Sequence, residues 1–346
     1  MKLGMLIGYS GRKLSLPLDL VRHVESLGYA SVWTSEAYGS DAVTPATWLL
    51  ANTSRIKVGT AIMQMPGRTP AMAAMTAMTL AQLSGNRFIA GVGASGPQVV
   101  EGWHGVAYGR PVTRLKEYVE VMRRIFAREG DLTFDGKEYQ IPYRGPGATG
   151  LGKPLKSILH CEAPIPIYAA TITPAGVEAA AQVADGFFPV WMDPEQYAVF
   201  AAPIAKGFAA SGKQKSLADF DIAPFVRVVV ADDVATAMQP LRESMALYIG
   251  GMGARGRNFY NDYATRLGFG DAARHIQDLY LEGRKAEAAA AVPDALIDAC
   301  HLVGPASRIK DRAQRWISAG REGHVGSMLI GASDPKAFEI MAEAVL

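Results

Sequence analysis

Strand-like and helix-like stretches alternate along nearly the whole chain, and this alternation constrains the fold more than any other feature. Short apolar runs rich in β-branched residues are separated by segments of helical length and pattern, as in repeated β-α-β units with a parallel sheet. The expected strands are residues 3–7, 31–34, 56–63, 88–92, 165–170, 186–190, 220–230 and 326–331. Eight strands followed by helices predict an α/β protein with a (β/α)₈ barrel.

The chain is longer than such a barrel requires. A (β/α)₈ barrel takes about 250 residues, so roughly 100 further residues must lie in insertions, which we expect in the βα loops. Two stretches stand out, about 130–164, with a hairpin signal at Asp135-Gly136, and about 250–303. Residues 1–346 are expected to form one barrel domain. The expected helices are 16–27, 45–52, 70–83, 113–128, 174–184 and 335–345.

Composition excludes several classes of protein. Lysine and arginine total 35 against 33 acidic residues, so the net charge of +2 gives no general reason to expect a nucleic-acid partner. Two cysteines and six histidines without metal-ligand spacing predict no structural metal. No apolar run reaches membrane-spanning length and no signal peptide is recognisable, so we expect a cytoplasmic protein without a membrane contact.

The fourth expected strand ends in residues that almost lack side chains. Ala94, Ser95 and Gly96 follow a buried run, so main-chain N–H groups there can approach a flat ring or a phosphate. The stretch 91–96 matches the GxGxxG dinucleotide fingerprint, but Pro97 follows and the next expected helix lies well beyond, which indicates an elaborated loop. Pro97 also occupies the last glycine position of a GxSxG nucleophile elbow, which argues against a serine hydrolase.

Residues just past the barrel strands converge on one mouth. Glu36 is the only carboxylate among them, and a half-buried position beside Tyr38, Met63 and Trp191 would suit acid/base chemistry, although a structural hydrogen bond to a loop explains it equally well.

A second group at the mouth could bind an anion. Thr171 and Thr173 precede a helix that begins with Pro174, so hydroxyls and free N–H groups meet there, while N-capping alone would explain one threonine.

Two basic stretches are ambiguous. Arg255 and Arg257 lie in a glycine-rich segment that could hold an anion, and Lys153 and Lys156 lie in another, yet a solvated basic loop accounts for both. The Met72, Met75 and Met78 stripe on the third expected helix indicates packing against the barrel or a partner subunit.

Taken together, these residues resemble the bacterial luciferase-like family, specifically its branch of deazaflavin (coenzyme F420)-dependent oxidoreductases. The resemblance runs end to end, and the stretches that carry it are 33–41, 95–105, 147–155, 184–186 and 253–259. It implies a (β/α)₈ fold with a tricyclic ring across the mouth, and a non-prolyl cis peptide in the third strand, by position Ala61–Ile62. It also implies a homodimer, with helices two and three as the candidate interface.

The resemblance assigns roles to the residues at the mouth. Glu36 would be the proton donor, and Tyr38, Met63 and Trp191 would line the pocket of a small-molecule substrate. Better-known relatives that oxidise sugar phosphates have histidine where Glu36 stands and glutamate where Gly96 stands, so their proton-transfer scheme does not carry over. The implied cofactor contacts are Ser35, Thr60, Ala61, Ile62, Ala94, Ser95, Gly96, Pro97, Ala170, Thr171, Ile172 and Thr173, with 170–173 near the phosphate.

The expected function is hydride transfer between coenzyme F420 and an unidentified small organic substrate. One alternative is a monooxygenase of the same fold that uses reduced FMN. A second is a non-catalytic protein that only binds the cofactor.

Overall fold

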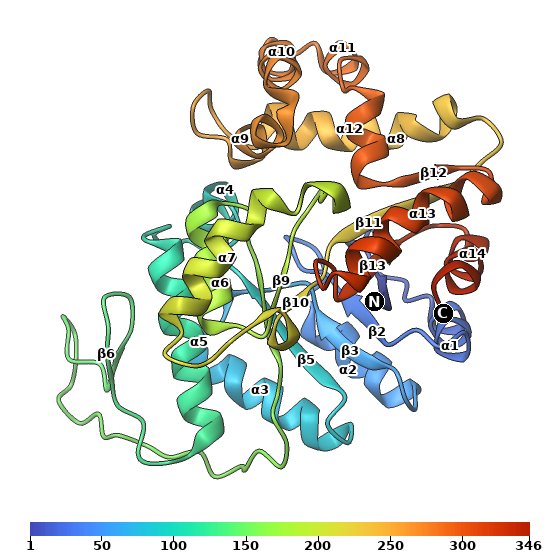
Figure 1. Ribbon diagram of the computed structural model, residues 1–346. Coiled ribbons are helices and arrows are strands. Elements are labelled where there is room, and N and C mark those ends of the chain that lie inside the picture. The colour runs from blue at the N-terminus through green and yellow to red at the C-terminus, as the bar shows by residue number, and fades with distance from the viewer.

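The parallel sheet closes into a barrel in the computed structural model, which describes residues 1–346 (Figure 1). Hydrogen bonds join neighbours in the order β10-β9-β8-β5-β3-β2-β1-β13-β11. Strands β10 and β11 are two parts of one seventh strand; β10 pairs with β9 and β11 with β13, so the ring closes there. This confirms the predicted barrel. The strands are Lys2–Leu6 (β1), Ser31–Thr34 (β2), Lys57–Thr60 (β3), Phe88–Gly93 (β5), Ile167–Ala170 (β8), Gly186–Phe188 (β9), Asp221–Ile222 (β10), Phe225–Val230 (β11) and Ser327–Gly331 (β13).

The third strand is interrupted, whereas the sequence predicted a continuous one over 56–63. Strand β3 ends at Thr60, and the chain resumes pairing with β5 only at Met63–Gln64 (β4). Between them lies the cis peptide Ala61–Ile62, as the resemblance implied.

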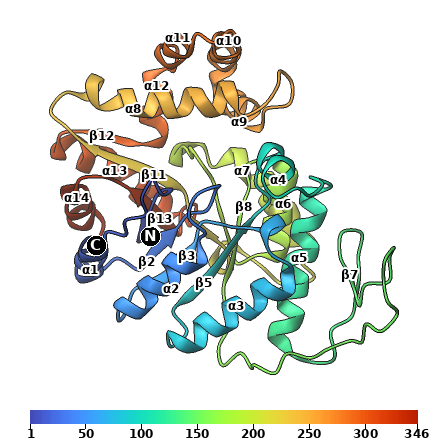
Figure 2. The same cartoon turned by 180° about the vertical axis from the view of Figure 1, so that it is seen from behind.

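Eight helices cover the outside of the barrel and bury its outer apolar side chains. Proline at the first helical position starts α3 and α6, and the preceding Thr69 and Thr173 cap them by accepting a backbone N–H. Helix α2 packs on β3 and α3 on β5 (Figure 2). The helices are Leu18–Ser26 (α1), Val43–Asn52 (α2), Pro70–Leu83 (α3), Pro111–Ala127 (α5), Pro174–Val183 (α6), Ala198–Ala210 (α7), Ala306–Arg321 (α13) and Pro335–Val345 (α14).

The first insertion lies away from the barrel mouth, which corrects its expected place in a βα loop. It joins the end of α5 to the start of β8, and such αβ connections run at the opposite end of the barrel. Its hairpin, Phe134–Asp135 (β6) and Gln140–Ile141 (β7), projects beside α5 (Figure 1). The Glu117 carboxylate on α5 holds it by accepting backbone N–H groups. Lys153 and Lys156 belong to this exposed insertion.

The second insertion forms a layer of helices at the other end of the barrel (Figure 1). It follows β11 and is longer than the expected 250–303, because it begins with α8. It also contains β12, a short strand that pairs with β11 and that the sequence did not predict. None of its helices, or of the others, combines the length and hydropathy needed to cross a bilayer. Its elements are Val234–Ala246 (α8), Phe259–Ala264 (α9), Gly270–Leu281 (α10), Lys285–Ala290 (α11), Asp294–Cys300 (α12) and Leu302–Gly304 (β12).

Candidate functional site

The floor of the mouth is bare main chain at the end of β5. A Cβ on Gly91 would collide with the Thr60 carbonyl oxygen, so this position requires glycine, while a Cβ on Gly93 would press against the end of the Ile62 side chain. Thr60 is fully buried; its hydroxyl donates to the Gly91 carbonyl (2.8 Å) and accepts from the Gly91 N–H (2.9 Å). Thr60 therefore joins the two strands immediately before the cis peptide Ala61–Ile62, and its expected contact with a cofactor stays a prediction.

The loop after β5 is shorter than the sequence indicated. Ser95 has a φ of 62°, a left-handed conformation that turns the chain, and Gly96 then precedes a short helix, Pro97–Gly102 (α4). The elaborated loop expected here is thus a tight turn into a helix that begins with Pro97, since proline suits a first helical position. Residues 94–97 lie at the mouth, directly after Gly93 and its Ile62 neighbour.

Ser35 links the ends of the first two strands. Its hydroxyl donates to the Ile7 carbonyl (2.8 Å), and the residue is 8 % exposed. The structure places Ser35 at the mouth, as expected, with its proton already committed to the main chain.

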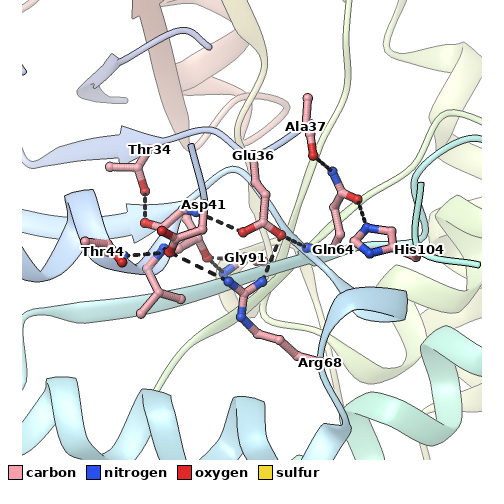
Figure 3. Close-up of polar contacts among 12 residues, drawn as sticks. Thr34, Glu36, Ala37, Asp41, Thr44, Gln64, Arg68, Gly91 and His104 are labelled. Carbon is pink, nitrogen blue, oxygen red and sulfur yellow. Dashed lines mark hydrogen bonds and ion pairs between the residues drawn. The ribbon is translucent and has the colours of Figure 1, made fainter. Parts of the chain in front are cut away.

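Glu36 is held by three donors (Figure 3). Its Oε1 accepts from the Gln64 N–H (2.9 Å) and from Arg68 Nη1 (2.8 Å), and its Oε2 accepts from the Ala42 N–H (2.9 Å). Burial disfavours the charge of Arg68, but the hydrogen bond and charge of Glu36 prevail and raise the pKa of the guanidinium. Two main-chain N–H groups and the Arg68 guanidinium thus hold the Glu36 carboxylate in place. This geometry favours an anchoring role that ties the β2 loop to β4 and α3.

A second polar pair beside Glu36 was missed by sequence reasoning (Figure 3). Gln64, 1 % exposed, donates from Nε2 to the Ala37 carbonyl (2.8 Å), and its Oε1 lies 2.6 Å from Nε2 of His104. Because the amide N–H₂ group faces a carbonyl, its oxygen must accept, so His104 carries a proton on Nε2. The available signals were a glutamine at the end of an apolar strand and a histidine in the loop beyond the glycine-rich turn.

Aromatic side chains stand on two sides of the mouth. Tyr38 and Trp103 pack with ring centroids 6.4 Å apart, and Trp191 packs on Tyr260 at 5.5 Å. Tyr9, 62 % exposed, lies near Tyr248 and Tyr260 on one side and near Tyr38 on the other. These rings form an aromatic wall: Tyr9, Tyr38, Trp103, Trp191, Tyr248 and Tyr260.

The structure places the three residues expected to line the substrate pocket in two different environments. Tyr38, 69 % exposed, and Trp191 belong to the aromatic wall. Met63 is fully buried and belongs to the main hydrophobic core.

The start of α6 gathers groups that can hold an anion. Thr173 caps the helix, accepting from the Gly176 N–H (3.1 Å), so the N-cap interpretation accounts for it. The Thr171 hydroxyl lies so close to Gly176 that a Cβ there would collide with it. Arg266, from the second insertion, donates to the Ile172 carbonyl (2.7 Å) and brings a positive charge that the sequence did not single out. Ala170, at the end of β8, leads into this loop.

Arg255 and Arg257, which the sequence offered as partners of an anion, have no contact with the start of α6. Arg255 pairs with Asp278 (2.7 Å) at the surface, so its charge is already compensated, and Arg257 forms no ion pair. No cluster of side chains suitable for a metal ion is present.

At the barrel mouth, the bare end of β5 lies beside the end of its neighbour β8, whose following helix begins with groups that can hold an anion. This arrangement defines an α/β-barrel protein suited to a flat, phosphate-bearing ligand. The chain belongs to the luciferase-like monooxygenase family, whose model matches residues 3–323.

Two relatives match this chain over more than nine tenths of its length. A Mycobacterium tuberculosis protein, provisionally named as a coenzyme F420-dependent oxidoreductase, is 40 % identical over 322 residues, covering 92 % of this chain and 93 % of the relative. The 5,10-methylenetetrahydromethanopterin reductase of Methanolobus tindarius is 25 % identical over 324 residues and 93 % of each chain.

Solved structures share the fold. The F420-dependent tetrahydromethanopterin reductase of Methanopyrus kandleri superposes with a TM-score of 0.77 at 21 % identity, over 99 % of this chain and 98 % of that one. An F420-dependent secondary alcohol dehydrogenase gives 0.73 at 19 % identity, over 100 % and 98 %. A monooxygenase of Streptomyces bottropensis gives 0.66 at 19 % identity with the same coverage.

Proposed function

We propose that this chain is an oxidoreductase that transfers hydride between coenzyme F420 and a small organic substrate. The observation that carries this proposal is the 40 % identity, over nearly the whole length of both chains, to a relative named for that cofactor. The barrel mouth supports it, because it combines a surface for a flat ring with a place for a phosphate.

The residues present fit such a cofactor. Ile62 and the bare loop 94–96 would lie against the ring, since Gly91 and Gly93 leave no side chain at this strand end. Thr171, the first N–H groups of α6 and Arg266 would hold the phosphate. When bound, the deazaflavin supplies or accepts the hydride, and the protein contributes orientation, exclusion of water and a proton.

Glu36 keeps two candidate roles. Proton donation, expected from the resemblance, stays a prediction, and its three donors support the alternative of a fixed anion that shapes the mouth. Substrate would lie beside Tyr38 and Trp191 on the aromatic wall.

A homodimer also stays a prediction. Trp48 on α2 and Met72 and Met75 on α3 are more than half exposed, on helices that cover the same side of the barrel (Figure 2). Sedimentation would test it. The cytoplasmic location remains an expectation of the sequence.

The rival function is a monooxygenase that uses reduced FMN, favoured by the description of the family itself. Titration of the protein with F420 and with FMN, followed by absorbance and fluorescence, separates the two. We expect saturable binding of F420. Binding of FMN without binding of F420 would overturn the proposal in favour of the rival, and F420 binding without turnover of any substrate would favour a non-catalytic role.

A further inference from the structure

We propose that His104 is a catalytic residue whose Nδ1 exchanges the proton with the oxygen of an uncharged carbonyl substrate or its alcohol, and that Gln64 is its positioning residue. This proposal rests on the proposed function. It concerns a side-chain pair that lies outside the residues assigned by the resemblance.

The location places His104 at the edge of the mouth. Gln64 pairs with Gly93 across β4 and β5, one residue before the bare loop. His104 bonds to Gln64 and is half-buried, and its chain neighbour Trp103 packs on Tyr38. The imidazole therefore lies beside the strand end that precedes the loop proposed for the ring, with its ring atoms near Gly67, and it follows Trp103 of the aromatic wall in the chain.

The hydrogen bonds fix which nitrogen is free. Both hydrogen-bonding ends of the Gln64 amide are used, the nitrogen on Ala37 and the oxygen on His104, and the Gln64 N–H is fixed on Glu36. Rotation of the amide would place its oxygen against the Ala37 carbonyl oxygen, two acceptors with no hydrogen between them. Nε2 of His104 thus keeps its proton in either charge state, and only Nδ1 gains or loses one.

The charges around the pair indicate an uncharged substrate. Glu36 and Arg68 neutralise each other beside Gln64, so neither is available to a substrate ion. The phenols of the aromatic wall are neutral near pH 7, because tyrosine has an ordinary pKa of about 10. A neutral aromatic surface binds apolar molecules and offers weak hydrogen-bond donors to a carbonyl oxygen.

Reduction of the carbonyl group requires one hydride and one proton. In reduction, the carbonyl carbon accepts hydride from reduced deazaflavin, the π-electron pair of the C=O bond moves to oxygen, and the oxygen takes the proton from Nδ1. His104 changes from the doubly protonated to the neutral ring, which still donates from Nε2 to Gln64. Alcohol oxidation runs the same steps in reverse. Imidazole is the side chain best suited to both directions near neutral pH.

The test compares His104→Ala and His104→Gln with His160→Ala, a control in the first insertion far from the mouth. We expect unchanged F420 binding in all three by fluorescence titration. Oxidation of reduced F420 by acetone, cyclohexanone or benzaldehyde should fall by about 100-fold or more in both His104 variants. Added imidazole should partly restore the alanine variant, and the control should match the parent.

A second readout does not depend on activity. Nitrogen NMR of labelled histidine should show the neutral His104 ring protonated at Nε2, and Gln64→Leu should yield a mixture of tautomers with F420 affinity preserved. Undiminished turnover in the His104 variants, or an Nδ1-protonated ring, would overturn the role of His104. No turnover of any carbonyl probe by the parent would overturn the substrate class. Failure of F420 to bind would instead refute the proposed function.

Discussion

At the scale of single residues, the two candidate roles of Glu36, anchoring anion and proton donor, predict different effects of one substitution. It lies 2.8 Å from Arg68 with 8 % of its side chain exposed, and Arg68 is 19 % exposed. Replacing Glu36 with glutamine removes the nearer counter-ion of this mostly buried guanidinium and leaves only the more distant Asp41. We expect Glu36→Gln to lower the free energy of unfolding by about 3 kcal/mol, measured by urea denaturation.

The matched control uses the other carboxylate near Arg68. Asp41 lies 3.7 Å from its second guanidinium nitrogen and is 43 % exposed, and asparagine would preserve its caps on α2. We expect Asp41→Asn to cost less than about 1 kcal/mol. If Glu36→Gln instead left stability unchanged and abolished turnover, proton donation would be its role.

At the scale of elements, the sequence predicted what local patterns encode. Strand 31–34 and helices 70–83 and 335–345 have the predicted bounds, because apolar runs, N-terminal prolines and polar caps agree there. The break after Thr60 was placed through the resemblance, since nothing in the apolar run 56–63 marks it. Strand β12 was missed because three residues give no periodicity and only pairing with β11 defines it.

For the candidate site, the sequence predicted only the residues whose position follows from the order of the strands. Residues at strand ends reach the mouth because topology delivers them there, and this predicted Ser35, the loop 94–97 and Thr171. Which hydrogen bonds a side chain makes depends on partners far away in sequence. Hence the Gln64–His104 pair, 40 positions apart, and Arg266, which reaches Ile172 from 94 positions away, were not foreseen.

Binding of the cofactor phosphate at the start of α6 can be tested by substitution. If its first turn, Thr171 and Arg266 hold the cofactor phosphate, Arg266→Gln should weaken F420 binding by about tenfold, the typical effect of losing a charge-assisted hydrogen bond. Arg255→Gln is the control, since that arginine is paired with Asp278. A deazaflavin without the phosphate should bind both variants equally in fluorescence titrations. Equal F420 affinity in both variants would contradict the assignment.

At the scale of the whole molecule, two arginines of α13 fix the helical layer to the barrel by contacting the C-terminal end of α12. On α13, Arg312 donates to the Asp298 carbonyl (2.8 Å) and Arg315 to the Ala299 carbonyl (2.9 Å), satisfying helix-end acceptors. Cys300 then donates from its thiol to the Trp191 carbonyl (3.0 Å). The layer and the aromatic wall are thereby held in one arrangement, which suits a mouth that must position two ligands.

The same junction makes stability of the whole fold sensitive to acid. His301, fully buried after α12, accepts the Arg227 N–H at Nδ1 (3.2 Å), and burial, with the nearby Arg227 charge, lowers its pKa to about 3. An unfolded histidine has a pKa of about 6.5, so the unfolded chain binds the proton first as pH falls. The stability contributed by the neutral ring is complete above about pH 6.5 and is lost as pH falls towards 3.

This dependence can be measured by urea denaturation between neutral pH and pH 4.5. We expect His301 to contribute a loss of about 1.4 kcal/mol of unfolding free energy per pH unit once the pH is well below 6.5. His301→Gln, which keeps an acceptor, should be less stable at neutral pH but should lose that part of the slope. His275→Gln, which replaces an exposed histidine of α10, should retain the parent's slope. Equal slopes in the two variants would show that acid acts elsewhere in the fold.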